Sequence, residues 1–447
     1  MISQQHDLRE ISNSVLEASG AEHTEVIVTD RDTALTRFAN SEIHQNVSER
    51  DIGVRIRVVN DHRVGVASTN QVGDGALRDA LDRALDSART QPPRPDLPPL
   101  APPAEVAPVP IDAATAHATP EDRAELVGAV CALADRSGVN AFGAVSTGVV
   151  TYCVANSNGL FSSSPRAVAH LRMVAMSGDG SGYADRTSQR IADLDAGAAG
   201  AEAIDKCLGT REAQAIEPGV YPVVLEEYAV ADLIEYLSYI GFSGLAAEEG
   251  RTFMRLGEKV TGDAISIWDD GRDPDGLPMP LDWEGVPRKR VDLITKGVAT
   301  GLVHDMSSAA RAGVESTGHG LPAPNPIGAM ALNLFMAGGE VKSKAELCEG
   351  IKRGVWVTRF WYVNIVHPKQ SQLTGMSRDG TFLVENGKVT RPIKNMRFTQ
   401  SVMEAFATAT GLSRATKLQA GDDYDFTPAY RVPAMRLERF NFTSVTR

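Results

Sequence analysis

The side chains that most often bind catalytic metals are scattered along this chain of 447 residues. Its nine histidines are far apart, and the nearest two are His304 and His319. A zinc site on a helix needs two ligands about one turn apart, so that both project from one face. The four cysteines form no pair either; they are Cys131, Cys153, Cys207 and Cys348. The sequence therefore predicts no metal site in this chain.

Two glycine-rich segments could bind a phosphate or carry a nucleophile. The first, GDGSGYAD at 178–185, lacks the Lys-Ser/Thr pair of a P-loop and does not fit the dinucleotide fingerprint. A sharp turn between strands is therefore expected there. The second, STGHG at 316–320, places Ser316 and Thr317 near His319, but no GxSxG motif surrounds them. A catalytic loop and a glycine-flanked loop that approaches a ligand both stay open for this segment.

Two adjacent glutamates begin a predicted helix, EEYAVADLIEYLSYI, directly after the predicted strand GVYPVVL. Glu227 is a candidate general base, because a carboxylate in a cleft can accept a proton from a substrate or a water. The helix dipole also favours carboxylates in a first turn, which would explain Glu226 and Glu227 without chemistry. Both interpretations stay open.

The charge balance excludes one class of partner. Lysine and arginine number 45 against 57 aspartates and glutamates, which gives a net charge of −12. A surface of that sign repels phosphate backbones, so we expect no nucleic-acid partner. No apolar stretch is long enough for a membrane helix, the first residues do not resemble a signal peptide, and the few cysteines fit a reducing compartment. We therefore expect a cytoplasmic protein without a membrane partner.

Hydrophobic periodicity predicts an α+β fold. Helical patterns over 5–20 and 75–89 flank strand-like runs that alternate with turn signals, and the Asn60-Asp61 pair is typical of a hairpin turn. The runs TEVIVTD and TALTRFA, and likewise IHQNVSE and GVRIRVVN, are expected to be separate strands. Residues 1–90 should thus form an N-terminal α/β sandwich-like domain with a mostly antiparallel sheet.

The rest of the chain divides into three further segments. Nine of the 24 prolines fall in 91–110, which favours either an extended connector or a ligand for a proline-binding domain. Residues 111–215 are expected to be a middle α+β region that packs with the N-terminal domain. Residues 216–447 should form a β-rich C-terminal domain with a few helices.

Several short motifs occur in a characteristic order along the chain. The N-terminal half contains GVR at 53–55 and GVAST at 65–69. The C-terminal half contains DWEGVPRKRVDLITKGVATGLVHD at 282–305, STGH at 316–319 and VENGKV at 384–389. Together these motifs resemble the TldD/PmbA family, bacterial and archaeal proteins associated with zinc-dependent peptide processing.

The resemblance implies which residues would correspond to a zinc site. Catalytic members carry His-Glu-x-x-x-His on the helix after the first strand of the C-terminal domain, and a later cysteine completes the site. Here Glu226 stands at the first histidine, Glu227 matches the glutamate, Ala231 replaces the second histidine, and Arg378 or a neighbour lies at the third ligand. The resemblance therefore implies no cofactor in this chain, with zinc only in a catalytic partner.

The chain accordingly resembles the TldE/PmbA-like, metal-free kind of member. Such a subunit would pair with a TldD-like zinc metallopeptidase homologue, as a heterodimer, or with itself, as a homodimer. The pair would enclose a cavity that an unfolded or modified peptide enters as an added strand. The alternative is a self-sufficient hydrolase or natural-product pathway enzyme that acts on a peptide or small-molecule conjugate, with Glu227, His319 or His367 as acid or base.

Candidate substrate-binding residues follow from this resemblance and from the aromatic segment 355–373. That segment could contact substrate or form a buried core strand. The candidates are Glu226, His319, Trp361, His367 and Arg378.

Overall fold

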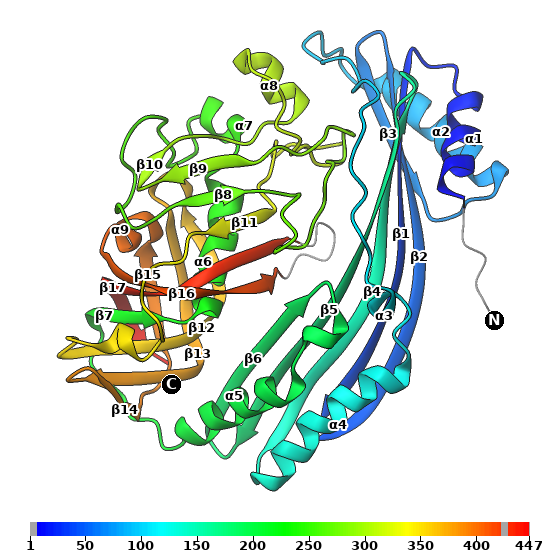
Figure 1. Cartoon of the computed structure of the whole chain (residues 1–447). Helices are drawn as coiled ribbons and strands as arrows, with labels where there is room; N and C mark the ends of the chain where they lie inside the picture. Colours follow the sequence, from blue (N-terminus) through cyan, green and yellow to red (C-terminus); the bar gives the residue numbers. More distant parts are fainter. Residues whose placement is uncertain (1–6, 422–427, 447) are drawn as a thin grey trace.

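Two β-sheets organise the chain, one from each half (Figure 1). The structure is a computed structural model and describes residues 7–421 and 428–446. The first sheet has six antiparallel strands in the order β3-β2-β1-β4-β5-β6. They are β1 (His23–Ala39), β2 (Glu42–Asn60), β3 (Arg63–Thr69), β4 (Asn140–Asn156), β5 (Phe161–Ser177) and β6 (Gly180–Ser188). The predicted α+β class is confirmed.

Alternating side chains give the first sheet two different faces. On β1, Val26 and Val28 pack against helices, whereas Ile27 between them packs against the C-terminal half. The helices on the covered face are α1 (Leu8–Ala18), α2 (Asp74–Thr90), α4 (Pro120–Arg136) and α5 (Ala196–Gly209), and the short α3 spans Ala113–Ala116. The opposite face is therefore available to build sites together with the C-terminal half.

The sheet is continuous across the proline-rich connector. β1 pairs with β4 from Glu25 opposite Asn156 to Phe38 opposite Gly143, so strands from 1–90 and from 111–215 share one sheet. The connector itself runs without a strand or regular helix, yet Leu100 and Ala101 are buried, and Ala101 packs against the C-terminal half. Asn156 donates a hydrogen bond to the Ala101 carbonyl at 2.8 Å, which fixes the connector to the sheet.

The predicted turns are confirmed, but the prediction that β1 and β2 would each be two separate strands was wrong. The hairpin turn after Asn60 is confirmed, since Asp61 and His62 adopt φ of 48° and 60° between β2 and β3. The sharp turn predicted in the glycine-rich segment 178–185 is also confirmed, at residues 178–179 between β5 and β6, and the rest of the segment belongs to β6. The runs expected as separate strands, in contrast, merge into the long β1 and β2. Cross-strand ion pairs such as Arg50 with Asp30, at 2.8 Å, hold the charged middle of these strands in the sheet.

The C-terminal half is a strand-rich unit with four short or medium helices among the described residues. Its 11-stranded sheet comprises β7 (Gly219–Leu225), β8 (Ile267–Asp269), β9 (Val291–Thr295), β10 (Val298–Ala299), β11 (Asn333–Met336), β12 (Arg353–His367), β13 (Gln372–Glu385), β14 (Lys388–Pro392), β15 (Met396–Ser401), β16 (Ala409–Ala420) and β17 (Ala429–Val445). The helices are α6 (Glu227–Ile240), α7 (Gly244–Glu248), α8 (Met306–Ala312) and α9 (Val402–Phe406).

Helix α6 lies at the centre of the largest hydrophobic core. Leu233, Ile234 and Leu237 are fully buried there among strand residues of the second sheet. The helix starts directly after β7, which pairs with both β12 and β17. The first turn of α6 is thereby fixed relative to three strands and faces the first sheet. Within the described ranges, no helix has the length and apolar character needed to cross a lipid bilayer.

Candidate functional site

A cleft of about 670 Å³ separates the first turns of α6 from the uncovered face of the first sheet. Arg172 on β5 and Tyr183 on β6 line it from one side, and Tyr228 and Ala231 on α6 line it from the other. Trp361 on β12 closes one end. In Figure 1 this region lies between β6 and the α6–β12 layer, where the two halves approach each other. A concave space between two halves of a chain is a common position for a binding site.

Glu226, at the N-cap of α6, is enclosed by donors. Its side chain is fully buried and does not cap the helix. One carboxylate oxygen, Oε2, accepts hydrogen bonds from Lys206 at 2.9 Å and from Lys344 at 2.8 Å. The other, Oε1, accepts from the indole of Trp356 at 2.9 Å and from the hydroxyl of Thr358 at 3.0 Å. Each carboxylate oxygen of Glu226 thus already accepts two hydrogen bonds from other residues of the chain.

A second carboxylate extends this arrangement toward the cleft. Glu202 on α5 accepts from Lys206 at 2.9 Å, from Arg186 at 2.8 Å and from the Tyr228 hydroxyl at 3.0 Å. The same Tyr228 hydroxyl is 2.9 Å from the ammonium of Lys417. Tyr228 therefore connects the buried ion network to the wall of the cleft. We call Glu202, Glu226, Lys206, Lys344 and Lys417 the lysine–glutamate cluster.

The electrostatics keep these carboxylates ionised. Burial raises the pKa of Glu226, but Lys206 and Lys344 lower it more, to a net value of about 2. Glu202 behaves in the same way, because burial is outweighed by Lys206 and Lys417 and its pKa falls well below the ordinary range. Lys344 has a raised pKa, since the attraction of the glutamates exceeds the cost of its burial. The cluster is consequently charged on both sides near neutral pH.

These residues do not fit a zinc ion. Two ammonium nitrogens lie within 3 Å of the Glu226 carboxylate, where they would repel a second cation. Ala231, at the position of the second family histidine, offers no ligand atom and only lines the cleft. Across residues 7–421 and 428–446, no three histidine, cysteine or carboxylate side chains converge as metal ligands. We therefore derive no chemical step that passes through a metal.

The far end of the cleft is aromatic and cationic. The guanidinium groups of Arg359 and Arg378 lie 5.0 Å and 4.9 Å from the centre of the Trp361 ring. The segment 355–373 is predicted from the sequence either to contact substrate or to form a buried core strand. Trp361 is 39 % exposed and Tyr362 is 71 % exposed, so these two rings are open to solvent. Phe360, the neighbour of Trp361, is fully packed into the core. Flat, exposed rings between arginines favour contact with unsaturated or aromatic groups of a ligand.

The remaining predicted residues lie elsewhere or are already bonded. Glu227 contacts Lys344 at 3.3 Å, beside Glu226. His319 is fully buried between Thr317 and Asp269, with its Nε2 2.9 Å from the Asp269 carboxylate, and lies outside the cleft. His367 lies at the exposed end of β12. The structure thus places Trp361 and Arg378 at one end of the cleft and Glu226 in the ion cluster behind Tyr228, and it leaves both histidines away from the cleft.

Sequence reasoning missed the lysines of the cluster. Lys206 is 20 positions from Glu226 in sequence, and Lys344 is 118 positions away. Neither lysine belongs to a motif, because any exposed helix or loop may carry an isolated lysine. Only the adjacent pair Glu226 and Glu227 at a predicted helix start gave a signal.

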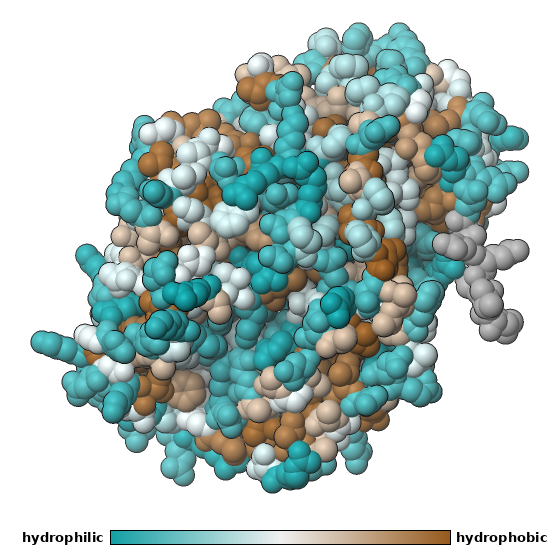
Figure 2. All heavy atoms as spheres, viewed as in Figure 1, coloured by the Kyte–Doolittle hydropathy of each residue, from teal (hydrophilic) through white to brown (hydrophobic). Residues whose placement is uncertain are grey.

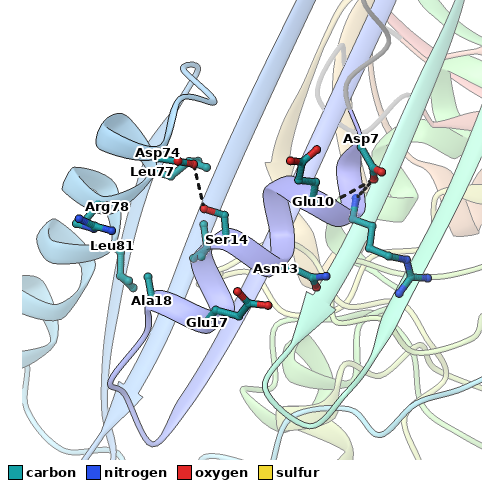
Figure 3. A pocket seen from close by; sticks show the side chains of 12 residues that line it. Asp7, Glu10, Asn13, Ser14, Glu17, Ala18, Asp74, Leu77, Arg78 and Leu81 are labelled. Atoms are coloured by element: carbon teal, nitrogen blue, oxygen red, sulfur yellow. Dashed lines mark hydrogen bonds between the residues drawn. The ribbon is translucent and has the colours of Figure 1, made fainter.

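A further groove lies between α1 and α2 on the outer face of the first sheet. It has a volume of about 680 Å³, and Figure 3 shows its acidic side chains Asp7, Glu10, Glu17 and Asp74 around Ser14. The figure also shows Ser14 bonded to Asp74, which joins the two helices at 3.4 Å. Hydrophilic and hydrophobic residues are interspersed over the molecular face seen in Figure 2. Among the described residues, the Ser14 hydroxyl meets only the exposed carboxylate of Asp74 and no histidine lines the groove, so we assign it no chemistry.

Comparison with known proteins gives two kinds of match. Residues 218–444 match the PmbA/TldA metallopeptidase C-terminal domain, and residues 24–88 match the PmbA/TldA metallopeptidase domain 1. The metalloprotease TldD homologue of Haemophilus influenzae is 28 % identical over 232 residues, which cover 49 % of this chain and 46 % of that protein. The chain therefore spans about half the length of the curated relatives that it matches.

Solved structures agree over nearly the whole chain. TldE from Thermococcus kodakarensis superposes with a TM-score of 0.82 at 21 % identity, covering 98 % of both chains. A proposed modulator of DNA gyrase from Thermotoga maritima superposes with a TM-score of 0.81 at 19 % identity, covering 97 % of this chain and all of that one. At this level of identity the likeness concerns the fold alone.

Proposed function

The chain belongs to the PmbA/TldD metallopeptidase family, and from this we propose that it is a metal-free subunit of a peptide-processing complex. Its partner would be a homologue that carries His-Glu-x-x-x-His, and the pair would act on unfolded or modified peptides in the cytoplasm. In this proposal the zinc belongs to the partner. This chain would supply scaffold and peptide-binding surface.

The lysine–glutamate cluster is the observation that carries the proposal. In a catalytic member, the position of Glu226 would hold a metal ligand. Here Lys206 and Lys344 place two positive charges against that carboxylate. They neutralise the position without supplying a Lewis acid or an activated water, which a metallopeptidase needs. A site of this kind preserves the local fold and removes the chemistry.

The shape of the cleft supports a role in binding. Trp361, Tyr362 and Tyr239 expose ring surface along a space of about 670 Å³, a volume suited to several side chains. Arg359 is held by Asp379 at one end of its guanidinium and stacks 4.1 Å from the centre of the Tyr183 ring. Rings that are fixed in advance bind a peptide at a low entropic cost.

Co-expression with a His-Glu-x-x-x-His homologue from the same host tests the proposal. Light scattering should report a complex of the two chains, and elemental analysis should find zinc in proportion to the homologue only. Peptidase activity on an unfolded protein such as casein should require both chains. Zinc-independent hydrolysis by this chain alone would contradict the proposal and favour the self-sufficient hydrolase.

A matched pair of variants connects the activity to the cleft. Trp361→Ala removes an exposed ring from the cleft, and the paired enzyme should then show a higher KM for the peptide. Val389→Ala changes an equally exposed side chain on β14, outside the cleft, and should leave the KM unchanged. Equal kinetics for both variants would mean that the cleft does not contact the substrate.

A further inference from the structure

A second cavity between the two halves lies at the other end of the molecule. Its volume is about 980 Å³, and its walls come from β1–β3, the connector, α7, α8 and the segment 321–326. Figure 1 shows α7 and α8 at the same end of the molecule as α1 and α2, away from α4 and α5. We call this cavity the interface groove. No residue of the lysine–glutamate cluster lines it.

The first sheet supplies the groove with one buried ion pair. Glu25 and Arg57 lie opposite each other on β1 and β2, on the face turned toward the C-terminal half. Their side chains are 2.8 Å apart, and Glu25 is only 2 % exposed. Burial raises the pKa of Glu25, although Arg57 lowers it in part. The pKa of Glu25 stays above its ordinary value, because Arg57 offsets only part of the cost of burial.

The C-terminal half supplies Glu284, from the Asp-x-Glu-Gly turn that the sequence singled out. Asp282 fixes this turn, because it is fully buried and accepts backbone N–H groups of Glu284, Val286 and Gly320 at 2.7–2.9 Å. The turn directs Glu284 into the groove. Gly320 leaves space for it, since a Cβ atom there would lie 2.5 Å from the Glu284 carboxylate oxygen.

The carboxylate of Glu284 has one neutral donor and no close cation. The backbone N–H of Met306 donates to it at 2.8 Å. No arginine or lysine of residues 7–421 and 428–446 forms an ion pair with it. Burial and the nearby carboxylates Asp282 and Asp305 raise its pKa well above the ordinary value, and Arg57 opposes them only in part. A cation bound beside Glu284 would lower this pKa and favour the ionised carboxylate.

The groove as a whole is acidic. Six carboxylates line it against three guanidinium groups. Two of the arginines are paired with carboxylates at the rim of the groove, since Arg311 binds Glu248 at 2.9 Å and Arg94 lies 4.0 Å from Asp96. The third, Arg57, is bound to Glu25. On the floor, Glu284 and Asp305 have no ion-pair partner among the described residues.

The walls indicate which cation fits. Val64, Val66, Leu97, Leu245 and Leu321 provide aliphatic surface above the floor. In the described part of the chain, no cluster of side chains converges closely enough to chelate a metal ion. Carboxylates on the floor and methylene-compatible walls suit an ammonium group carried on an aliphatic chain.

We propose that the interface groove binds an alkylammonium group, with Glu284 and Glu25 as its acceptors. The group would come from a lysine side chain of a peptide or from a free polyamine. This site does not depend on the subunit role proposed above, and its test needs no partner chain.

Titration calorimetry with the purified chain tests the site. The probes are cadaverine, a peptide with a single internal lysine and blocked ends, and two uncharged controls, pentanediol and the same peptide with norleucine. We expect the charged probes to bind and the uncharged controls to bind at least tenfold more weakly. Glu284→Gln should weaken the charged probes about tenfold or more, because it removes a charge-assisted hydrogen bond. Glu315→Gln, at an exposed position outside the groove, should leave binding unchanged.

A second variant covers the case in which Glu284→Gln does not fold. Val66→Lys places a tethered ammonium in the groove from β3, and Val66→Met adds similar length without charge. The lysine variant should abolish cadaverine binding, and the methionine variant should retain more of it. Binding by the peptide alone assigns the group to lysine side chains, and binding by cadaverine alone assigns it to polyamines. Absence of binding by both, or equal binding of charged and uncharged probes, would overturn the proposal.

Discussion

Replacing Glu226 by glutamine measures how strongly the lysine–glutamate cluster joins the two halves of the chain. The carboxylate accepts four hydrogen bonds, two at each oxygen. Glutamine has one accepting oxygen. If that oxygen faces Trp356 and Thr358, the amide donor points at Lys206 and Lys344; if it turns, the amide donor points at Trp356 and Thr358. The first orientation loses both lysine bonds; the second leaves the Trp356 indole without its acceptor, while the Thr358 hydroxyl can turn and accept from the amide.

The magnitude follows from the pKa of the buried group. The difference between the ordinary glutamate value of 4.5 and about 2 in the folded chain corresponds to about 3 kcal/mol of stabilisation by the ionised form. Removing one partner from a buried ion pair typically costs about 3–5 kcal/mol, which is of the same order. We therefore expect Glu226→Gln to lower the free energy of unfolding by about 3 kcal/mol. The melting temperature should fall by about 3 °C, because the unfolding entropy of a 447-residue chain is about 0.9 kcal/mol/K.

Urea unfolding followed by far-UV circular dichroism gives the measurement. The folded-state pKa of Glu226 is depressed, so its stabilisation is present above pH 4.5 and is lost as the pH falls toward about 2. The difference in the free energy of unfolding between wild type and variant should therefore be largest at neutral pH and should decrease below about pH 4.5. Glu315→Gln, whose side chain is 89 % exposed, is the control and should leave the free energy of unfolding nearly unchanged. A gap below about 1 kcal/mol at neutral pH would refute the reasoning.

Three further predictions concern packing and the absent metal. Leu100→Ala should lower the free energy of unfolding in urea by about 2–4 kcal/mol, because Leu100 is buried. Pro99→Ala, at the exposed neighbour, should lower it much less. Equally small effects would mean that the connector links the two segments without packing against them. Gly285→Ala should cost about 3 kcal/mol, since φ is +79° and a Cβ would lie 2.2 Å from Leu160. Gly257→Ala, at φ +81° in open space, isolates the backbone cost of about 1 kcal/mol, and similar losses at both glycines would disprove the packing part. The double variant Glu226→His with Ala231→His should retain no zinc after dialysis, because Lys206 and Lys344 remain; one zinc per chain by elemental analysis would show that a third ligand exists.

Local sequence signals predicted the helices and turns well. Helix α4 begins where Thr119 and Asp122 form a reciprocal capping box with Pro120 in the first turn, a pattern visible in the sequence. The hairpin after Asn60 was readable for the same reason, because its turn needs only adjacent residues. Long strands were harder to predict. The charged residues Asp30 and Asp32 are typical of a turn, yet both are paired with β2 inside one continuous strand.

Contacts between distant positions were not predictable from one sequence. His319 stood in a glycine-flanked motif typical of a functional loop. In the structure it is buried and bonds Asp269, 50 positions earlier, and so connects the loop to β8. Glu226 was found by its place before a helix, but its lysines come from α5 and from a loop before β12. The functional meaning of both residues depends on partners that no local pattern reveals.

The pairing of β1 with β4 has a consequence for synthesis of the chain. One edge of β1 is covered as soon as β2 emerges, but the other waits for Asn140–Asn156, about 100 residues later. At about 5–20 residues per second this edge stays open for roughly 5–20 s on the ribosome. An open strand edge can pair with a neighbouring chain, and charges at mid-strand discourage this. Asp30, Arg31 and Asp32 occupy that place in β1, so the residues that obscured the strand in the sequence also protect it while the protein is made.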